Sequence, residues 1–279
     1  MIYNCYQLYS TLHRNSDFIF SLTENLERCY YKKRQPKKKF SENQCNKDGS
    51  IKYRDLIPPV QSLKLVQKEI VAVLQNIALP GCMYGSVAGK NNILNTLKHI
   101  ENNYFLTIDL KNFFPNITNK QVHQTLVDNG FNWQVARIIT KLTTHKGSLP
   151  QGSPTSPILA NLVSVKLVNA LQLLSEKHAI TFTTFLDDLS FSSKTCFKNL
   201  IPEILRIVSN HNFFVHHKKI HYRTGRCEIT GLIIDKGKLK LVPDMKTRLN
   251  SNSKLRQYYR SIEHHYKQYL QSLPHSGLQ

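Results

Sequence analysis

Two adjacent aspartates, Asp187 and Asp188, stand inside the stretch FLDDLSFS (185–192), whose other residues are mostly apolar or β-prone. Like charges this close together repel, and removing an unpaired carboxylate from water costs on the order of several kcal/mol. A buried hairpin can contain such a pair only if a positive charge lies beside it. The stretch therefore requires either a metal ion or a basic residue from elsewhere in the chain.

A third carboxylate stands on another predicted strand. YFLTIDL (104–110) reads as a buried strand with one charge, Asp109, near its end. Residues 180–193 form two β-rich arms, which favours a hairpin with both aspartates at its turn. If the strands are neighbours in one sheet, the three carboxylates suit Mg²⁺ and two-metal phosphoryl transfer. A lone pair of aspartates would more often be a solvated turn.

The rest of the chain reads as a mixture of helices, short strands and polar loops. Helices are predicted in residues 1–30, 63–77 and 93–103, after a cap at Thr118, in the second part of 149–179, at about 198–212 and in the last 40 residues. A further strand pair is predicted around 227–235. Residues 30–40 form a basic run, and polar loops are expected at 41–50 and 81–92.

The charge balance favours a polyanionic partner. Thirty-eight Lys and Arg against eighteen Asp and Glu give a net charge of +20. Nucleic acid is the simplest partner for such an excess, and a solvated basic surface is the alternative.

The cysteines and the apolar segments favour a cytoplasmic protein. The six cysteines are scattered without a Cys-x-x-Cys pair, which argues against a disulfide framework and a Cys-based zinc site. We expect no membrane-spanning helix, and the start of the chain lacks the pattern of a signal peptide. The sequence therefore predicts a protein of a reducing cytosol without a membrane partner.

Four sequence blocks carry a resemblance to a known family. They are YFLTIDLKNFFPNI, LPQGSPTSPILANLV, TFLDDLSFSS and EITGLIID. In this order and spacing they resemble a bacterial reverse transcriptase of the retron type, from about residue 50 to residue 242. LPQGSPTSP is the most specific block.

Two further elements point to retrons. Asn95 and His99 fit the family's Asn-Ala-x-x-His element, with Thr96 in place of Ala. Thr230 and Gly231 fit its Val-Thr-Gly element. A capping Asn and a packed His on an ordinary helix are the alternative for the former pair.

The resemblance implies an α+β right-hand polymerase with fingers, palm and thumb. N-terminal helices and fingers would occupy 1–105, the palm 106–235 with a fingers insertion at about 119–148, and a short helical thumb 236–279. The short thumb raises the possibility of a second subunit, a different RNA or an unusual template mode.

The resemblance also assigns the catalytic residues. Asp109, Asp187 and Asp188, helped by the backbone carbonyl of Leu110, would hold two Mg²⁺ ions, for which Mn²⁺ can substitute. Lys219 lies where the family places a lysine that protonates the leaving pyrophosphate. An ordinary surface lysine is the alternative for Lys219.

Other residues are assigned to the nucleotide and the primer. Phe114 resembles the gate that excludes a 2′-hydroxyl and selects dNTPs, with an ordinary core Phe as the alternative. Gln151 and Gly152 would touch the incoming nucleotide and the template. Arg54, with lysines of the 37–39 run, would grip the triphosphate, although those lysines could equally form a solvated loop.

The elements that point to retrons would bind RNA and primer. These residues are Asn95, His99, Thr230 and Gly231, and CEITGLIID resembles the hairpin that holds the primer.

The implied function is the copying of part of a structured non-coding RNA into DNA, in anti-phage defence and with a possible effector protein. Two alternatives stay open: a defence reverse transcriptase of another lineage that makes repetitive or untemplated DNA, perhaps protein-primed, and a non-catalytic RNA-binding scaffold. Phe185 and Leu186 stand where the family usually has Tyr and Ala, which puts rate and nucleotide choice in doubt.

Overall fold

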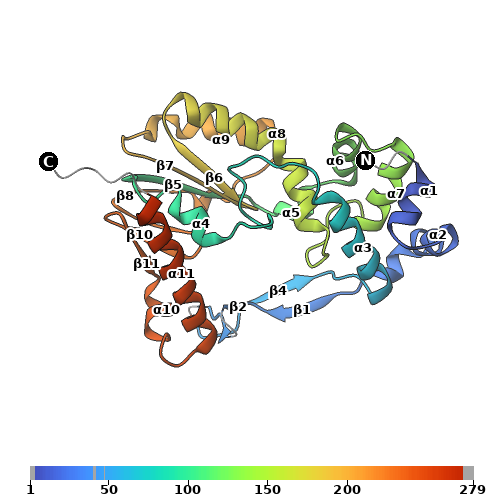
Figure 1. The fold of residues 1–279 in the computed structure, drawn as a ribbon, viewed down its shortest axis with the longest axis horizontal. Coiled ribbons are helices and arrows are strands. Elements are labelled where there is room, and N and C mark those ends of the chain that lie inside the picture. Colours follow the sequence, from blue (N-terminus) through green and yellow to red (C-terminus); the bar gives the residue numbers. More distant parts are fainter. Residues whose placement is uncertain (1–3, 40–41, 47, 273–279) are drawn as a thin grey trace. The chain divides into compact units, whose positions relative to one another are not determined.

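The protein divides into two compact units. The structure is a computed structural model that describes residues 4–39, 42–46 and 48–272. One unit comprises residues Met1–Pro80 and Asn112–Lys166, and the other comprises Gly81–Lys111 and Leu167–Gln279. Figure 1 labels the elements of each unit. The predicted division into fingers, palm and thumb stays a prediction.

The second unit contains a four-stranded antiparallel sheet (Figure 1). Its strands, in pairing order, are β6 (Thr181–Phe185), β7 (Asp188–Ser193), β5 (Tyr104–Asp109) and β8 (His221–Thr224). The predicted strand and the predicted hairpin are therefore neighbours in one sheet, as the metal-site hypothesis requires.

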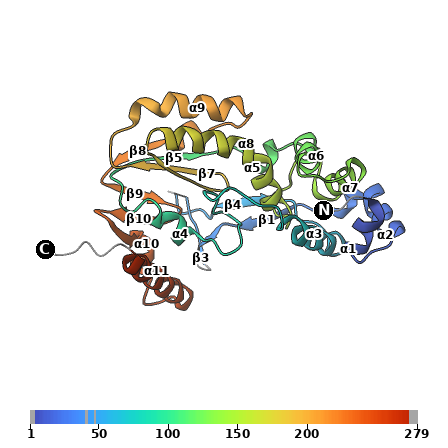
Figure 2. The ribbon, with the colours of Figure 1, turned by 45° about the horizontal axis from the view of Figure 1, so that its top comes forward.

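The two faces of this sheet differ in chemistry because side chains alternate along each strand. One face carries Leu106, Phe182 and Phe191, which are buried, and the two Phe rings stack at 4.7 Å. The other face carries Thr183 and Ser192, which are also buried. Figures 1 and 2 show α9 (Ile201–Asn210) and the second half of α8 (Ser156–Lys177) on one side of the sheet and α4 (Asn92–Leu97) on the other.

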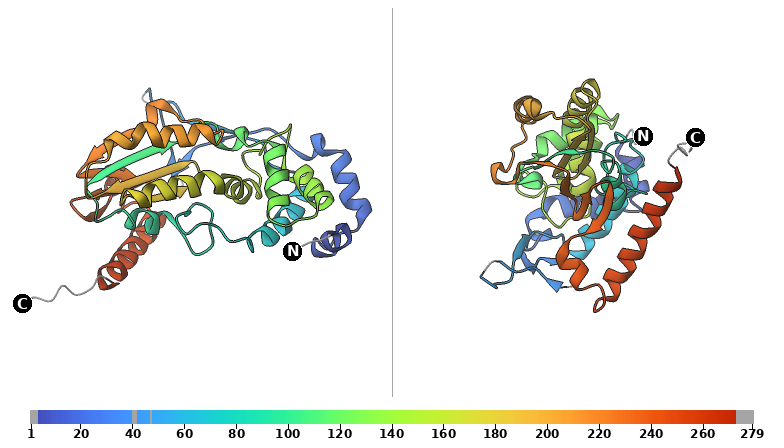
Figure 3. Two further views of the ribbon diagram at one scale, coloured as in Figure 1. Left: turned by 90° about the horizontal axis from the view of Figure 1, so that it is seen from above. Right: turned by 90° about the vertical axis from the view of Figure 1, so that its left-hand side faces the viewer.

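A smaller antiparallel sheet follows in the same unit. It consists of β9 (Arg226–Ile229), β10 (Leu232–Asp235) and β11 (Lys238–Leu241), and the chain continues into α10 (Pro243–Thr247) and α11 (Ser253–Ser272). Figure 3 shows α11 beside this sheet, and the Tyr266 hydroxyl donates to the Gly237 carbonyl at 3.3 Å. The pair β9 and β10 was predicted, whereas β8 and β11 were not.

The first unit consists mainly of helices. They are α1 (Cys5–Thr11), α2 (Ser16–Glu24), α3 (Gln61–Leu74), α5 (Phe113–Asn116), α6 (Asn119–Asp128), α7 (Trp133–Thr143) and the start of α8. The predicted cap at Thr118 is confirmed, because Thr118 and Gln121 form a reciprocal capping box at the start of α6.

Strands replace the basic run and polar loop predicted for 30–50. β1 (Lys33–Pro36) pairs with β4 (Tyr53–Leu56), and β2 (Lys38–Lys39) pairs with β3 (Glu42–Asn43). Both β1 and β4 are almost entirely exposed, so neither shows the apolar alternation by which a strand is recognised in a sequence. Short helices η1 (Leu26–Cys29), η2 (Lys198–Leu200) and η3 (His217–Lys219) complete the described elements.

No membrane-spanning helix was expected, but among the described helices α8 is long and apolar enough to be considered as one. By length and composition alone it could cross a membrane, since its most apolar window has a mean hydropathy of 1.5. However, 56% of that window is buried within the protein. Leu159, Leu167 and Leu171 are buried, as the periodicity predicted. A core helix of a globular protein meets the same criterion, so the observation is weak evidence for a membrane span.

Candidate active site

The register of the four-stranded sheet brings the carboxylates together. Asp109, the last residue of β5, lies directly opposite Asp188, the first residue of β7. The Leu110 N–H donates to the carbonyl of Asp187 at 2.8 Å, which ties the end of β5 to the turn before β7. The hairpin is thus confirmed, but only Asp187 lies in its turn.

The turn consists of Leu186 and Asp187. Leu186 has a φ of 56°, in the left-handed region that side chains larger than glycine rarely adopt. The Thr184 hydroxyl donates to the Leu186 carbonyl at 3.1 Å and helps to hold this conformation. A positive φ at the start of a two-residue hairpin turn places Asp187 between the paired ends of β6 and β7.

A basic residue from a later part of the chain lies beside the carboxylates. Lys219 Nζ lies 2.7 Å from Asp109 Oδ2, with side chains that are 52% and 21% exposed. The backbone brings Lys219 there, because the His216 N–H donates to the Asp109 carbonyl at 2.9 Å and the Lys219 N–H donates to the His216 carbonyl at 2.7 Å. Lys219 thus supplies one positive charge that the paired aspartates require.

The negative charge is only partly compensated. Burial, followed by the neighbouring charges of Asp187 and Asp109, raises the pKa of Asp188 to about 7. Burial, followed by the charge of Asp109, also raises the pKa of Asp187. Lys219 opposes both shifts without cancelling them. A cation bound here would therefore relieve an existing electrostatic cost.

The carboxylates suit Mg²⁺ by their chemistry. Oxygen donors on adjacent strands and the raised pKa of Asp188 fit a hard divalent cation. Within residues 4–39, 42–46 and 48–272, however, no three His, Cys, Asp or Glu side chains are close enough together to form a complete metal site. The predicted ligands share one end of the sheet, and their coordination of an ion stays a prediction.

A segment that was predicted only as a loop lies against the back of the carboxylate turn. Thr184 of β6 donates through its N–H to the Cys82 carbonyl at 2.9 Å and accepts from the Tyr84 N–H at 2.8 Å, so Met83 pairs with Thr184 like a short parallel strand. A Cβ built on Gly85 would lie 2.5 Å from the Leu186 nitrogen. Only glycine fits at this position without a shift of the turn.

Lys90 holds that segment in place. Its ammonium donates to the Met83 carbonyl at 2.9 Å and to the Gly81 carbonyl, and it lies 4.7 Å from the centre of the Tyr84 ring. Burial lowers the pKa of Lys90. Neither Gly85 nor Lys90 stands out in the sequence, because nothing local in GCMYGSVAGK indicates what this segment packs against.

Asn95 and His99, predicted to bind RNA, are fully buried at 0% exposure. His99 bonds through its two ring nitrogens to Ser192 Oγ at 2.6 Å and Thr183 Oγ1 at 2.7 Å, and burial lowers its pKa to about 3. His99 is therefore neutral and joins α4 to the polar face of the sheet. The His99 backbone N–H donates to the Thr96 carbonyl at 3.0 Å, three residues back and not four as in an α-helix. Helix α4 therefore ends at Leu97, earlier than predicted.

Thr230 and Gly231 form the turn between β9 and β10. Both have positive φ, 45° and 85°, as a two-residue turn of type I′ requires. Asn95 Nδ2 donates to Thr230 Oγ1 at 3.3 Å, and Asn92 Nδ2 donates to the Thr230 carbonyl at 3.0 Å and to the Tyr258 hydroxyl at 2.6 Å. A role of Asn95 in RNA binding would therefore act through this turn.

The remaining predicted residues belong to the first unit. Arg54 is exposed on β4, Phe114 is half-buried beside Phe113, and Gln151 accepts through its carbonyl from the Ile57 N–H at 2.7 Å. Gly152 has a φ of 110° and would place a Cβ 3.4 Å from Leu56. Their approach to the carboxylates stays a prediction, and the side chains of residues 38 and 39 lie outside the described part of the chain.

Buried polar contacts fix the loop that contains Gln151 and Gly152. Ser153 Oγ donates to Gln67 Oε1 at 2.7 Å, and Gln67 Nε2 donates to the Leu142 carbonyl at 2.8 Å and to the Tyr30 hydroxyl at 2.9 Å. Gln67 is fully buried, on the apolar face of α3. Its role was missed, because a single Gln on an amphipathic helix gives no signal of a partner so far along the chain.

Comparison with known proteins identifies the family of this chain. The family described as "Reverse transcriptase (RNA-dependent DNA polymerase)" matches residues 36–234, and the chain belongs to this family. Within it, retron reverse transcriptases are among the relatives of this chain, which confirms the resemblance seen in the sequence.

Three relatives show the extent of the similarity. The Retron Ec86 reverse transcriptase of Escherichia coli is 28% identical over 67% of this chain and 60% of its own length. The Retron Mx162 and Mx65 reverse transcriptases of Myxococcus xanthus are each 28% identical, over 68% and 65% of this chain and 45% and 48% of their own lengths. The chain thus spans about half the length of the curated relatives that it matches.

Solved structures support the fold alone. Apo telomerase from Candida tropicalis matches with a TM-score of 0.53 and 12% identity, over 76% of this chain and 47% of that one. Telomerase from Candida albicans in complex with a TWJ fragment of telomeric RNA matches with a TM-score of 0.50 and 10% identity, over 81% and 50%. The mixed helices and antiparallel sheets are therefore those of a reverse-transcriptase fold.

Proposed function

We propose that this protein is an RNA-directed DNA polymerase of the retron type, which adds nucleotides from dNTPs to a growing DNA strand. One observation carries the proposal. Asp109 lies directly opposite Asp188 on paired strands, Asp187 lies in the adjoining turn, and all three belong to one unit with Lys219. Membership of the reverse transcriptase family supports the same activity.

The three carboxylates and the Leu110 carbonyl would hold two Mg²⁺ ions, or Mn²⁺ in their place. Bound there, the ions would supply activation of the primer hydroxyl and neutralisation of the triphosphate. Lys219 supports a complementary role, because its ammonium lies beside Asp109 and can be presented to the leaving pyrophosphate as a proton donor. The ordered bonds from His216 to Asp109 keep Lys219 at this place.

The first unit would select and grip the nucleotide. Phe114 would exclude a 2′-hydroxyl, and Gln151 and Gly152 would line the base pair. Arg54 would bind the triphosphate, which is supported by its exposed position on β4 and its lack of an ion pair among the described residues. Fingers, palm and a short thumb are the subdomains that we assign to this arrangement.

The template would be part of a cognate structured non-coding RNA. The relatives' names and the net charge of +20 support this substrate class. Thr230 and Gly231, shaped by Asn95 and indirectly by His99, would form part of the surface that holds RNA and primer. We assign the protein to anti-phage defence in the bacterial cytoplasm, with an effector protein or second subunit as a further partner.

Sequencing of the nucleic acid that co-purifies with the protein tests the proposal. The chain is expressed from its native locus as wild type, as Asp187→Asn and as a control, Asp17→Asn, which changes an exposed carboxylate on α2. Wild type and control should yield a defined RNA with complementary DNA. Asp187→Asn should yield the RNA alone, because it loses a carboxylate of the site.

The other outcomes would overturn parts of the proposal. Complementary DNA made by Asp187→Asn would contradict the assignment of the carboxylates. Repetitive DNA without a copied RNA would indicate a defence reverse transcriptase of another lineage. RNA without DNA from the wild type, under every condition, would indicate a scaffold.

A further inference from the structure

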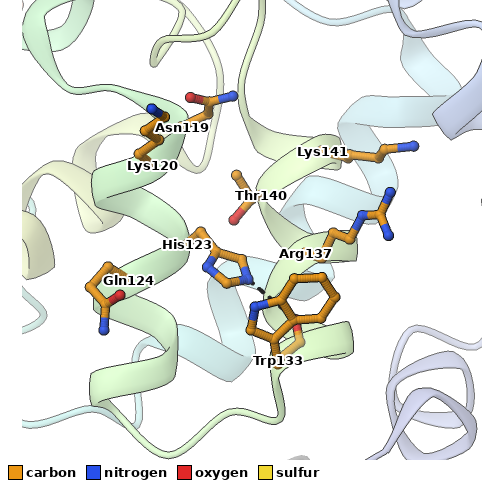
Figure 4. A pocket seen from close by; sticks show the side chains of 8 residues that line it. All are labelled: Asn119, Lys120, His123, Gln124, Trp133, Arg137, Thr140 and Lys141. Atoms are coloured by element: carbon orange, nitrogen blue, oxygen red, sulfur yellow. Dashed lines mark hydrogen bonds between the residues drawn. The ribbon is translucent and has the colours of Figure 1, made fainter.

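A cavity in the first unit combines an exposed aromatic ring with basic side chains. It lies between α6 and α7, has a volume of about 560 Å³ and is shown in Figure 4. Trp133, the only tryptophan in the chain, is 58% exposed there. None of the lining residues is among those that the sequence assigns to polymerisation.

The tryptophan is held in position by its neighbours. The His123 ring meets the indole edge-on at 5.5 Å, and the ring nitrogen of His123 bonds to the Trp133 carbonyl at 3.3 Å. The Arg137 guanidinium lies 5.8 Å from the indole centre. An exposed, fixed indole of this kind offers a flat surface on which a nucleobase can stack.

Three cations surround the cavity without a carboxylate among its lining residues. Lys120 lies on α6, and Arg137 and Lys141 lie one turn apart on α7. Among the residues that the structure describes, none of the three forms an ion pair. Their charge is therefore available to an anionic ligand.

A buried hydroxyl in the same cavity lacks a partner. Thr140 is only 7% exposed, and its Oγ1 has no hydrogen-bond partner. Figure 4 shows this hydroxyl directed into the cavity, between Lys141 and His123. An unpaired buried hydroxyl costs free energy, so its persistence here points to a ligand that bonds to it.

We propose that this cavity binds single-stranded nucleic acid, with an unpaired base stacked on Trp133, the flanking phosphates on Lys120, Arg137 and Lys141, and a polar edge bonded to Thr140. RNA and DNA both carry such bases and phosphates, so either of them can bind at this site. The proposal goes beyond the polymerase activity, since it needs neither dNTP nor the carboxylates. An acidic protein segment would use the cations but has no base to stack on the indole.

The single tryptophan provides a local readout. The full chain is titrated with the oligonucleotides (dT)8 and (rU)8, without dNTP or divalent metal, and Trp133 fluorescence is followed. Saturable quenching is expected with at least one of them, because a stacked base quenches indole emission. The two arms distinguish DNA from RNA, and poly-glutamate provides the test of an acidic peptide.

Variants in which Trp133 is retained distinguish this site from other nucleic-acid contacts. Arg137→Gln with Lys141→Gln should weaken the quenching isotherm at least tenfold and reduce the slope of log K against log salt by about 1.4, for two phosphate contacts on a single strand. The matched control, Lys64→Gln with Lys68→Gln, removes the same charge from exposed positions on α3 and should leave the isotherm within about twofold.

Thr140→Val distinguishes a ligand-binding role from a structural one. Removal of an unpaired buried hydroxyl should leave thermal stability unchanged or raise it, while the oligonucleotide affinity falls about three- to tenfold. The proposal is overturned if neither oligonucleotide quenches Trp133, if poly-glutamate quenches it equally, or if the α3 control weakens binding as much as the α7 variant. Failure of polymerisation would leave these results unaffected.

Discussion

Gly85 lies against the backbone of Leu186, so closely that a Cβ at position 85 would be 2.5 Å from the Leu186 nitrogen. The chain from Cys82 to Gly85 thereby supports the turn that carries Asp187. A backbone-to-backbone contact of this kind has no flexible side chain that could move aside, so the position of the turn depends on the absence of a side chain at residue 85.

Gly85→Ala should impair polymerisation more than folding. The added methyl must displace the Leu186 backbone, and Asp187 moves with it. We expect the rate of primer extension to fall at least tenfold, since small displacements of catalytic groups are costly. Gly81→Ala is the matched control, because its Cβ would meet nothing within 4 Å. Equal rates for the two variants would show that the turn does not depend on Gly85.

Cation binding should strengthen as the pH rises through about 7. The pKa of Asp188 is raised to about 7, so a proton competes with the cation below this pH. Between pH 6 and pH 8 the affinity for Mn²⁺, measured by electron paramagnetic resonance, should increase about tenfold for one competing proton. Asp188→Asn should bind Mn²⁺ weakly and lose this pH dependence.

The Asp188 carboxyl has the opposite effect on stability, which should fall as the pH rises, whereas cation affinity should increase. Its pKa lies above the ordinary value of 3.8, so the folded protein without added metal holds a proton that the unfolded chain releases. The contribution of Asp188 to the free energy of unfolding is therefore fully present below about pH 4 and is lost as the pH rises through 7. Urea unfolding of wild type and Asp188→Asn from pH 5 to pH 8 checks this sign, and added Mg²⁺ should reduce the difference.

Substitutions of Lys219 should distinguish its electrostatic role from its role as a proton donor. Lys219→Arg keeps the positive charge beside Asp109 but cannot donate a proton at neutral pH. We expect its single-turnover rate to fall about a hundredfold or more, as for loss of a general acid, and Lys219→Gln to lose at least as much. Stability should change little, because the Lys219 side chain is half exposed and solvent weakens its ion pair with Asp109. A wild-type rate for Lys219→Arg would limit Lys219 to an electrostatic role.

Leu186→Gly and Leu186→Ala isolate the cost of the left-handed conformation. Both remove the Leu side chain, but only glycine adopts a φ of 56° without strain. Leu186→Gly should be more stable than Leu186→Ala by about 1 kcal/mol in urea unfolding. The opposite order would show that packing rather than backbone strain decides stability at this turn.

Much of the sheet could be predicted because its signals are local. The segment 104–110 and the two arms around Asp187 and Asp188 are short runs of apolar and β-prone residues, as buried strands have, and β5, β6 and β7 follow them closely. The ribbon of β1 and β4 was missed for the same reason. Its side chains face solvent on both sides, so no alternation of apolar residues exists to be read.

The candidate site shows a similar division. The carboxylates stand out in the sequence because two adjacent negative charges in an apolar run demand compensation. His99 and Asn95 stand out by their motif, but the motif does not indicate that both side chains are buried. Nor does it indicate that His99 bonds to Ser192 and Thr183, or that Asn95 bonds to Thr230. Burial depends on packing over the whole unit, and the same residue types occur on surfaces and in cores.

The sequence by itself determined that the adjacent Asp187 and Asp188 need a positive charge beside them, that Asp109 stands near the end of another β-prone run, and that a net charge of +20 favours a polyanionic partner. Only the tertiary structure decided that Lys219 supplies a charge, that Gly85 supports the turn and that Thr140 is left without a partner beside Trp133. The physical reason is that charge and side-chain alternation are properties of neighbouring residues, whereas these contacts join segments far apart in the chain and exist only when the whole unit packs.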